Sequence, residues 1–402
     1  KTLNLPKMPT LEEAAGADRA WWSTANLRYK GQLVPQRLAN LTNAASSSGN
    51  ADQLVSFANE VYGFFGQNIH KYNNSTDSWG SSLFAGSASF TDVLVARVNG
   101  TVYMLGAATE RIYYTTDGST WTANETDGTY VCWWDNKVWA IDNTGQLKFT
   151  TMIDPTAAWA NDAILPLPSD YVTDLFVGLD VSGAPIVYAM TKVGLYAHDF
   201  TTNSFVATKF ELPLHPNNGI GVTRWRDSMY INSGLGVYRY LDGVGTPVVS
   251  LVGPDRDDGL PADKRGVIRK LVASHNDLFA VLDSTTGPAT ATTINLFVSG
   301  ESFVIDPLTG FSSILAWDEQ AWQVQWLGGN VSERITTAVV ANAYDAYRLW
   351  WAVGNRVYWM ELPQDIINPN EVTDFDYALT ATHETPWFNA GQQEVDKLAL
   401  SY

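Results

Sequence analysis

Short apolar stretches alternate with polar turns along most of the chain, and one pattern recurs. A polar turn is followed by an apolar residue, an aromatic residue and further strand-like sequence, as in Asn99-Gly100-Thr101-Val102-Tyr103. Apolar positions that recur with a period of two are typical of strands with one buried face. The aromatic residues that mark the pattern are Tyr62, Tyr103, Trp139, Tyr188, Tyr230, Phe279 and Trp350.

The spacing of these marker aromatics predicts the fold. The first five intervals cluster around roughly 40–50 residues, the length of a four-stranded propeller blade. Apolar stretches such as Leu54–Phe57 precede the markers, and alternating stretches such as Ile112–Thr115 follow them. We therefore expect an all-β fold, a β-propeller of about seven four-stranded blades. The longer interval before Trp350 predicts an insertion within residues 287–326. The alternative is a generic multi-sheet β protein in which hairpins align by chance.

The two ends of the chain differ from the repeats. We expect an N-terminal extension over residues 1–45 with a short helix at Leu11–Ala17 and an outer strand, the propeller over 46–378, and C-terminal strands over 379–402. A propeller needs a strand that closes the ring, because an open blade leaves an unpaired sheet edge. Either end can supply it. The alternation of Glu394–Tyr402 favours closure by the C-terminal segment, with docking on a neighbouring chain as the alternative.

Composition narrows the classes of function. Hydrophobic residues make up 45% of the chain, enough for a large core, and the formal net charge is −17. An acidic protein lacks the basic surface of a nucleic-acid binder and is repelled by anionic membranes. No apolar run reaches the roughly 18 residues of a membrane-spanning helix. We expect neither nucleic acid nor membrane insertion. Cys132 is the single cysteine, so we expect a buried small residue rather than a disulfide or a nucleophile.

Candidate catalytic residues are sparse. Thr115–Trp121 resembles the Asp-box turn of sialidase-like propellers, and Asn74–Trp79 looks like a degraded copy. We predict that Asp117 bonds backbone amides of its own turn and touches no ligand. A sialidase also needs an arginine cluster, an activated tyrosine and an acidic proton donor. The spacing of the arginines marks no such cluster; those available are Arg28, Arg97, Arg111, Arg224, Arg226, Arg334, Arg348 and Arg356.

Metal and cofactor motifs are weaker still. Asp255–Gly259 resembles a calcium loop, but its ligand spacing is one residue short and no bidentate Glu follows. The histidines, at His70, His198, His215, His275 and His383, lack zinc-site spacing. No phosphate-binding loop or nucleophile elbow is found. We therefore expect no catalytic residue, no cofactor, no metal site and no enzymatic activity.

Three segments resemble β-propeller proteins of tailed-bacteriophage virions, found in tails and tail-associated hubs. They are Asn26–Gly31, Gly253–Pro261, and Glu384–Gly391 leading into Lys397–Leu400. The resemblance implies a virion location and a structural role in symmetric copies. The expected function is a non-enzymatic, tail-associated interaction component whose partners are other virion proteins, with a host surface glycan as a further partner. The alternative is a carbohydrate-binding or sialidase-like propeller. In that case the stacking platforms would come from Trp21, Trp22, Trp225 and Trp326.

Overall fold

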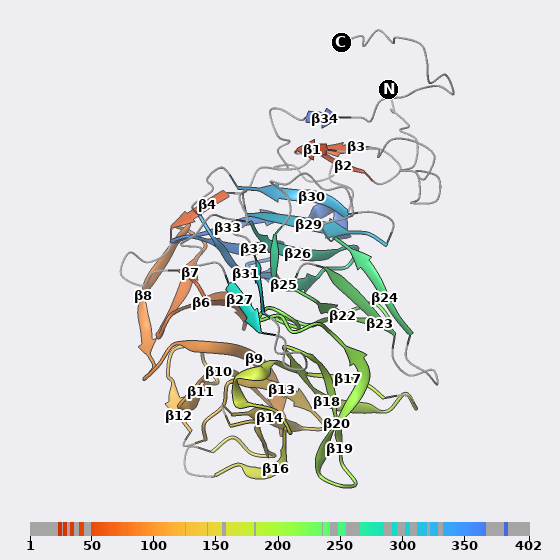
Figure 1. Cartoon of the computed structure of the whole chain (residues 1–402). Coiled ribbons are helices and arrows are strands. Elements are labelled where there is room, and N and C mark those ends of the chain that lie inside the picture. The colour runs from red at the N-terminus through yellow and green to blue at the C-terminus, as the bar shows by residue number, and fades with distance from the viewer. Residues whose placement is uncertain are drawn as a thin grey trace, which may run out of the picture.

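Seven blades, each of four antiparallel strands, surround a common axis in the computed structural model of the chain, and a parallel pairing of Asn43 with Ser78 joins the first and seventh blades into one sheet (Figure 1). The fold is a seven-bladed β-propeller, which confirms the sequence prediction. The structure describes residues 23–25, 27–29, 33–35, 40–43, 50–124, 126–142, 144–154, 158–180, 182–234, 236–241, 248–254, 266–284, 292–295, 302–305, 312–319, 322–328, 333–366 and 382–384.

The first six blades take their strands in chain order, from the axis outward. The first blade contains β5 (Gln53–Phe57), β6 (Glu60–Phe65), β7 (Asn68–Asn73) and β8 (Ser78–Ala85). The second contains β9 (Phe90–Val98), β10 (Thr101–Ala108), β11 (Arg111–Thr115) and β12 (Thr122–Ala123). The third contains β13 (Tyr130–Trp134), β14 (Lys137–Ile141), β15 (Gln146–Thr150) and β16 (Ala160–Ile164). The fourth follows the 3₁₀ turn η1 (Ser169–Tyr171) and contains β17 (Val172–Leu179), β18 (Pro185–Thr191), β19 (Gly194–Asp199) and β20 (Ser204–Glu211).

The remaining blades follow the same plan. The fifth contains β21 (Thr223–Trp225), β22 (Ser228–Asn232), β23 (Val237–Leu241) and β24 (Val248–Gly253). The sixth contains β25 (Val267–Ala273), β26 (Leu278–Asp283), β29 (Ser313–Trp317) and β30 (Trp322–Leu327). The seventh contains β31 (Ile335–Ala343), β32 (Ala346–Val353), β33 (Arg356–Glu361) and β4 (Asn40–Asn43), with helix α2 (Pro363–Ile366) after β33.

Every marker aromatic lies on the second strand of its blade, as the repeat predicts. The predicted insertion is also present, because the hairpin β27 (Thr292–Asn295) and β28 (Ser302–Ile305) lies between β26 and β29. The period of two explains the packing. On β6, Val61 and Phe65 pack against the seventh blade, whereas Tyr62 and Phe64 pack against the second.

Among the residues that the structure describes, the hydrophobic core is divided into seven clusters, and each lies between two neighbouring blades. Large aromatic side chains fill these gaps, because one ring covers a large area and the sheets diverge outward. Trp350, for example, is fully buried and contacts Tyr72 of the first blade at a ring-centroid distance of 4.8 Å. Burial between blades, rather than within them, therefore holds the ring together.

The ring is closed by the N-terminal segment. The strand β4 pairs antiparallel with β33, with Thr42 opposite Val357, and so completes the seventh blade. The prediction that Glu394–Tyr402 closes the ring is therefore wrong, since β4 holds that position. An outermost strand needs backbone pairing more than an apolar face, so alternation was a poor guide to it. Residues 394–402 and the predicted helix at 11–17 lie outside the described residues.

The two extensions also meet each other. The strand β1 (Ser23–Ala25) pairs with β34 (Thr382–Glu384), and β2 (Leu27–Tyr29) pairs with β3 (Leu33–Pro35). Both β1 and β2 contact β30 of the sixth blade. Segments from the two extensions therefore lie together beside one blade (Figure 1).

Candidate functional site at the propeller axis

The first strands of the blades are the innermost ones. Most of them contact the first strands of the neighbouring blades, so that β5, β9, β13 and β17 follow one another around the axis. Polar side chains on these strands meet at the axis. They come from blades that are not neighbours in the ring, which is possible only near its centre.

Two aspartates occupy matching positions on alternate blades. Asp92 is the third residue of β9 and Asp174 the third residue of β17. One oxygen of each accepts a bond from the next backbone N–H, from Val93 at 2.8 Å and from Leu175 at 2.7 Å. The other oxygen of each accepts a bond from a backbone N–H of the following blade, from Val131 to Asp92 at 2.9 Å and from Val222 to Asp174 at 2.8 Å. Both carboxylates are therefore fixed in position by the backbone.

Lys270 brings a positive charge to the same region. It lies in β25 of the sixth blade, and its Nζ donates to Gln53 Oε1 of the first blade at 3.1 Å and to Thr337 Oγ1 of the seventh at 3.4 Å. Gln53 Nε2 in turn donates to the carbonyl of Thr91 in the second blade at 3.0 Å. We call Asp92, Asp174, Lys270, Gln53 and Thr337 the axial cluster.

The charges of the axial cluster are poorly compensated. Burial raises the pKa of Asp92 to about 6 although two backbone N–H groups and Lys270 oppose the shift. Burial and then repulsion from Asp92 raise the pKa of Asp174 to about 8. Burial also lowers the pKa of Lys270, against the attraction of both carboxylates. Asp92, Asp174 and Lys270 nevertheless remain partly exposed.

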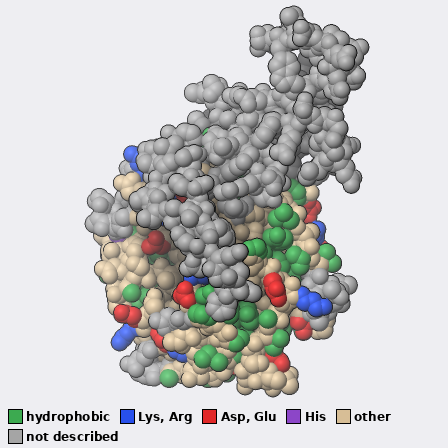
Figure 2. Space-filling model, in the orientation of Figure 1, with side chains coloured by type: hydrophobic (Ala, Val, Ile, Leu, Met, Phe, Trp, Pro, Cys, Tyr) green, Lys and Arg blue, Asp and Glu red, His purple; other side chains and the backbone are tan. Residues whose placement is uncertain are grey.

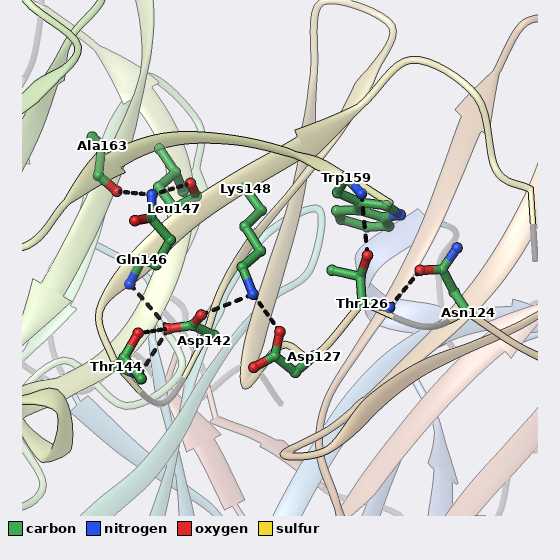
Figure 3. A network of polar contacts seen from close by, with 10 residues as sticks. All are labelled: Asn124, Thr126, Asp127, Asp142, Thr144, Gln146, Leu147, Lys148, Trp159 and Ala163. Atoms are coloured by element: carbon green, nitrogen blue, oxygen red, sulfur yellow. Dashed lines mark hydrogen bonds and ion pairs between the residues drawn. The ribbon is translucent and has the colours of Figure 1, made fainter. Parts of the chain in front are cut away.

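A second lysine–aspartate group behaves in the opposite way. Figure 3 shows Lys148 of β15 bonded to both Asp127 and Asp142, with 2.9 Å between its Nζ and Asp142 Oδ2. Asp142 Oδ1 also accepts bonds from the backbone N–H groups of Thr144 at 2.8 Å and Gln146 at 3.0 Å. Burial disfavours the charge of Asp142, but bonds from Thr144 and Lys148 lower its pKa overall. We call Lys148, Asp127 and Asp142 the third-blade triad.

The remainder of the network in Figure 3 links the end of the second blade to the third. Trp159 N donates to Thr126 Oγ1 at 3.3 Å, and Thr126 N donates to Asn124 Oδ1 at 2.8 Å. The Gln146 amide donates to the carbonyls of Leu147 and Ala163, each at 2.9 Å. These contacts tie the loops between the second and third blades to strands of the third, so we assign the network a structural role.

The prediction for Asp117 is confirmed in its geometry. Its Oδ1 accepts the backbone N–H groups of Ser119 at 2.8 Å and Thr120 at 2.7 Å, within its own turn. These bonds hold the pKa of the Asp117 carboxyl well below its usual range. The related Asp77 contacts other elements, because Trp359 Nε1 of the seventh blade donates to its Oδ1 at 3.2 Å.

Three of the arginines considered for a sialidase site pair with separate carboxylates, although Arg334 shares Asp283 with Arg269. Arg226, Arg334 and Arg348 pair with different carboxylates, which are Glu319, Asp283 and Glu361 respectively. The side chain of Arg28 lies outside the described residues. Within the ranges that the structure describes, no three His, Cys, Asp or Glu side chains are grouped to hold a metal ion.

The proposed stacking tryptophans have different surroundings. Trp225 is buried, and its Nε1 donates to the Ser274 carbonyl at 3.0 Å, so it cannot serve as a platform. Trp326 packs on Trp351 in a core cluster. Trp21, Trp22 and the Asp255–Gly259 loop lie outside the described residues.

Two smaller expectations can be compared with the structure. Cys132 is buried, as predicted, and burial raises the pKa of its thiol. Its position on β13 places it in the core cluster between the third and fourth blades. Among the helices that the structure describes, none has the length and apolarity needed to cross a membrane.

The axial cluster was missed by the sequence analysis, although a signal existed. Thr91-Asp92-Val93-Leu94-Val95 and Thr173-Asp174-Leu175-Phe176-Val177 are copies of one motif at the start of an apolar strand. A charged residue that recurs at the same place in an otherwise apolar strand segment indicates a special position. Lys270 interrupts the apolar β25 in the same way.

The sequence matches no protein-family model and no curated protein. Solved structures share its fold. The extracellular domain of a putative hybrid two component system from B. thetaiotaomicron matches 80% of this chain with a TM-score of 0.56 and 10% identity, and the chain spans 39% of that protein's length. YCF48 from Cyanidioschyzon merolae matches 82% of this chain and 99% of its own, with a TM-score of 0.52 and 10% identity. A chain of the mitotic checkpoint complex matches 90% of this chain and 97% of its own, with a TM-score of 0.50 and 12% identity. Identities this low establish a common fold alone.

Proposed function

We propose that the chain is a non-enzymatic structural and interaction component of a tailed-phage virion, associated with the tail. Its partners are other virion proteins, which it meets in symmetric copies. The proposal starts from the resemblance of three sequence segments to such proteins, and a feature of the propeller surface supports it.

The supporting observation is a set of exposed apolar side chains on the outermost strands of three consecutive blades, concentrated on β24, which we call the apolar rim. Ile164 of β16, Val206 of β20 and Val248 of β24 are exposed by 62%, 51% and 57% on the outermost strands of the third, fourth and fifth blades. On β24, Val249 and Leu251 are exposed as well. Figure 2 shows hydrophobic side chains gathered on the side where β24 lies in Figure 1. Apolar residues clustered on a surface mark sites of protein–protein contact.

The geometry of the rim suits assembly. An outermost strand carries backbone N–H and C=O groups on its free edge, so a partner can both pair with it and cover its apolar side chains. The ring behind it is closed by β4 and packed by seven inter-blade clusters, and it can therefore present the rim without rearrangement. A specific contact between virion proteins would bury at least about 1,000 Å² in total.

Cryo-electron microscopy of the native particle tests the proposal. We expect propeller-shaped density in symmetric copies at the tail, with residues 248–251 within an interface. A Val249→Glu, Leu251→Glu double variant should fold but fail to enter particles, because it places two charges in that interface. Val102→Glu is the matched control, since Val102 is 42% exposed on β10 and away from the rim.

Two results would contradict the proposal. The first is absence of the chain from purified particles. The second is turnover of glycan substrates by the purified protein, which would favour the sialidase-like alternative. Incorporation of the double variant at the level of the Val102→Glu control would leave the virion role standing but remove the rim as its docking surface.

A further inference from the structure

The outermost strand of the fifth blade has an open edge. Among the strands that the structure describes, β24 pairs with β23 alone, and it lies on the outside of the propeller (Figure 1). Its consecutive residues Val248, Val249, Ser250 and Leu251 are all exposed. Neighbouring residues of a strand point to opposite faces, so both faces of β24 are accessible. The strand therefore offers a partner backbone N–H and C=O groups together with apolar side chains.

The outermost strands of the other blades have features that β24 lacks. The strand β30 is contacted by β1 and β2, and β12 is only two residues long. Charged residues stand on β16, at Asp162, and on β20, at Lys209. The pairing of Asn43 with Ser78 joins β4 to β8. Coverage, short length and charge are the means by which proteins keep sheet edges from pairing. In contrast, β24 has six residues and no charged side chain.

The exposed side chains of β24 continue an apolar surface of the fifth blade. Val249 lies opposite Tyr240 of β23, and Leu251 lies opposite Tyr238. Directly opposite residues of an antiparallel pair share one face of the sheet. Both tyrosines pack in the core cluster between the fourth and fifth blades. Val249 and Leu251 therefore extend this cluster outward, where a further strand beside β24 would cover them.

The sequence of β24 is nearly symmetric about Ser250. It reads Val248-Val249-Ser250-Leu251-Val252, with an apolar residue at each position on either side of the serine. In an antiparallel pair of two such strands with a two-fold axis at Ser250, residue 249 of one copy lies opposite residue 251 of the other. Residues 248 and 252 face each other in the same way. Each apolar side chain then has an apolar partner, so a second copy of this chain complements the strand.

The distribution of charge also favours a second copy. The chain has a formal net charge of −17, so two copies repel each other through most of their surfaces. Residues 243–254 contain no charged side chain. Two copies therefore approach at the lowest electrostatic cost where these segments meet. Salt screens the remaining repulsion and should strengthen the association, whereas it would weaken the binding of an oppositely charged partner.

We propose that β24 pairs antiparallel with β24 of a second copy of this chain, about a two-fold axis at Ser250. The inference rests on the proposed function, because it names the partner that covers the apolar rim. Pairing of β4 with β8 shows that outermost strands of this propeller meet within one chain. Two strands of six residues form a small interface. We therefore expect a dissociation constant of about 1–100 μM.

Disulfide cross-linking of the full chain tests the register. Ser250→Cys places two cysteines directly opposite each other at a Cα distance of about 4.5–5.5 Å, which a disulfide bridges. Oxidised glutathione should therefore give a covalent dimer on a non-reducing gel. Val249→Cys is the matched control, since its two copies lie diagonally at about 7–8 Å, too far for a disulfide. Val102→Cys controls for random collision, and the native Cys132 is buried in every variant.

Sedimentation velocity tests the pairing without a cross-link. Val249→Glu, Leu251→Glu places like charges opposite each other and should weaken the dimer at least about tenfold. Val249→Lys, Leu251→Glu also adds two charges but places opposite charges across the two strands. Its dimer should be at least about fivefold tighter than that of the first double variant. Circular dichroism identifies a variant that failed to fold, and the conservative Ser250→Cys change then decides.

Three results would overturn the pairing. They are a chain that stays monomeric at about 200 μM, cross-linking of Ser250→Cys no better than that of Val249→Cys, and equal dissociation of the two double variants. The pairing and the virion role fail separately. A monomeric chain that is present in purified particles contradicts the pairing alone. A dimer with the predicted cross-link, formed by a chain that is absent from particles, supports the pairing and contradicts the virion role.

Discussion

The third-blade triad and the axial cluster are built from the same residue types and reach opposite electrostatic outcomes. In the triad, Lys148 bonds directly to both Asp127 and Asp142, and these bonds raise the pKa of Lys148 against the opposing effect of its burial. In the axial cluster, Lys270 bonds to neutral groups, and burial lowers its pKa. The carboxyl groups show the same contrast, because the pKa of Asp142 is lowered and the pKa of Asp174 is raised.

The difference teaches how to separate structural charges from candidate functional ones. A lysine that contacts its carboxylates compensates them, so the group stabilises the fold and needs no ligand. A lysine held apart from its carboxylates by neutral partners leaves all three charges short of solvation. Sequence composition alone cannot distinguish the two cases, because both contain one lysine and two aspartates.

The largest change in stability is expected when the Asp142 side chain is removed. Asp142→Ala should lower the free energy of unfolding by about 3–5 kcal/mol, because it leaves the Lys148 ammonium short of a buried partner and frees the turn amides. Urea unfolding measures this. Asp127→Ala is the control, since the Asp127 side chain is 38% exposed and its loss should cost about 1 kcal/mol or less. Equal losses would show that the triad is not organised around Asp142.

Unfolding measured over a range of pH should distinguish the axial cluster from the third-blade triad, because stability depends on pH in opposite directions for Asp174 and Asp142. The raised pKa of Asp174 means that the folded state holds its proton more tightly than the unfolded chain does. That contribution is complete below the ordinary carboxyl pKa of 3.8 and is lost as pH rises through about 8. Asp174→Asn stays neutral, so its stability relative to the unmodified protein should rise across this range, by about 1 kcal/mol or more.

The matched variant for this series is Asp142→Asn. Its carboxyl has a lowered pKa, so the stability it provides is present above 3.8 and is lost as pH falls through the folded value. The stability that Asp142→Asn loses relative to the unmodified protein should therefore become smaller in acid. The stability that Asp174→Asn loses should not become smaller there. Parallel pH profiles for the two variants, followed by thermal unfolding, would contradict the contrast.

A smaller effect is expected at Gln53. Gln53→Leu removes the acceptor of Lys270 and the donor to Thr91, and it should cost about 1–2 kcal/mol in urea unfolding. Gln67→Leu, at an exposed turn of the same blade, should change stability by about 0.5 kcal/mol or less. No difference between the two variants would mean that Gln53 does not link the sixth and second blades.

The smallest effect is expected at Asp117, whose charge is compensated by exposed turn amides. Asp117→Ala should slightly lower the unfolding temperature near neutral pH, because Ser119 and Thr120 lose their shared acceptor. Because the pKa of Asp117 is lowered, its contribution is present above its usual value and disappears as pH falls. An unfolding temperature that is unchanged at neutral pH would contradict the structural role.

The sequence predicted the parts of the fold that repeat. Each marker aromatic, such as Tyr62 or Trp350, recurs because every blade needs a large ring between diverging sheets, and this leaves a periodic signal. Closure of the ring by β4 leaves no periodic signal in the sequence, because Asn40–Asn43 pairs with a strand more than 300 residues away and needs no apolar face. The choice between two chain ends is a non-local one, and local patterns do not carry it.

The axial cluster was predictable in part. The repeated Thr-Asp pairs at 91–92 and 173–174 could have marked two of its members. Their convergence with Lys270 could not have been foreseen, because it depends on the geometry of alternate blades around an axis. Whether a lysine bonds to a nearby carboxylate, as Lys148 does, or to amide and hydroxyl groups, as Lys270 does, is decided by side-chain placement.

A carbon-13 NMR titration of the aspartate carboxyl groups in the full chain tests the central claim most directly. Substitutions at Asp92, Asp174 and Asp142 would assign the three signals. We predict that Asp92 and Asp174 titrate above the ordinary value of 3.8 and that Asp142 titrates below it. If Asp174 were to titrate at or below the value of Asp142, the axial cluster would be a compensated structural group like the third-blade triad, and the contrast between them would be wrong.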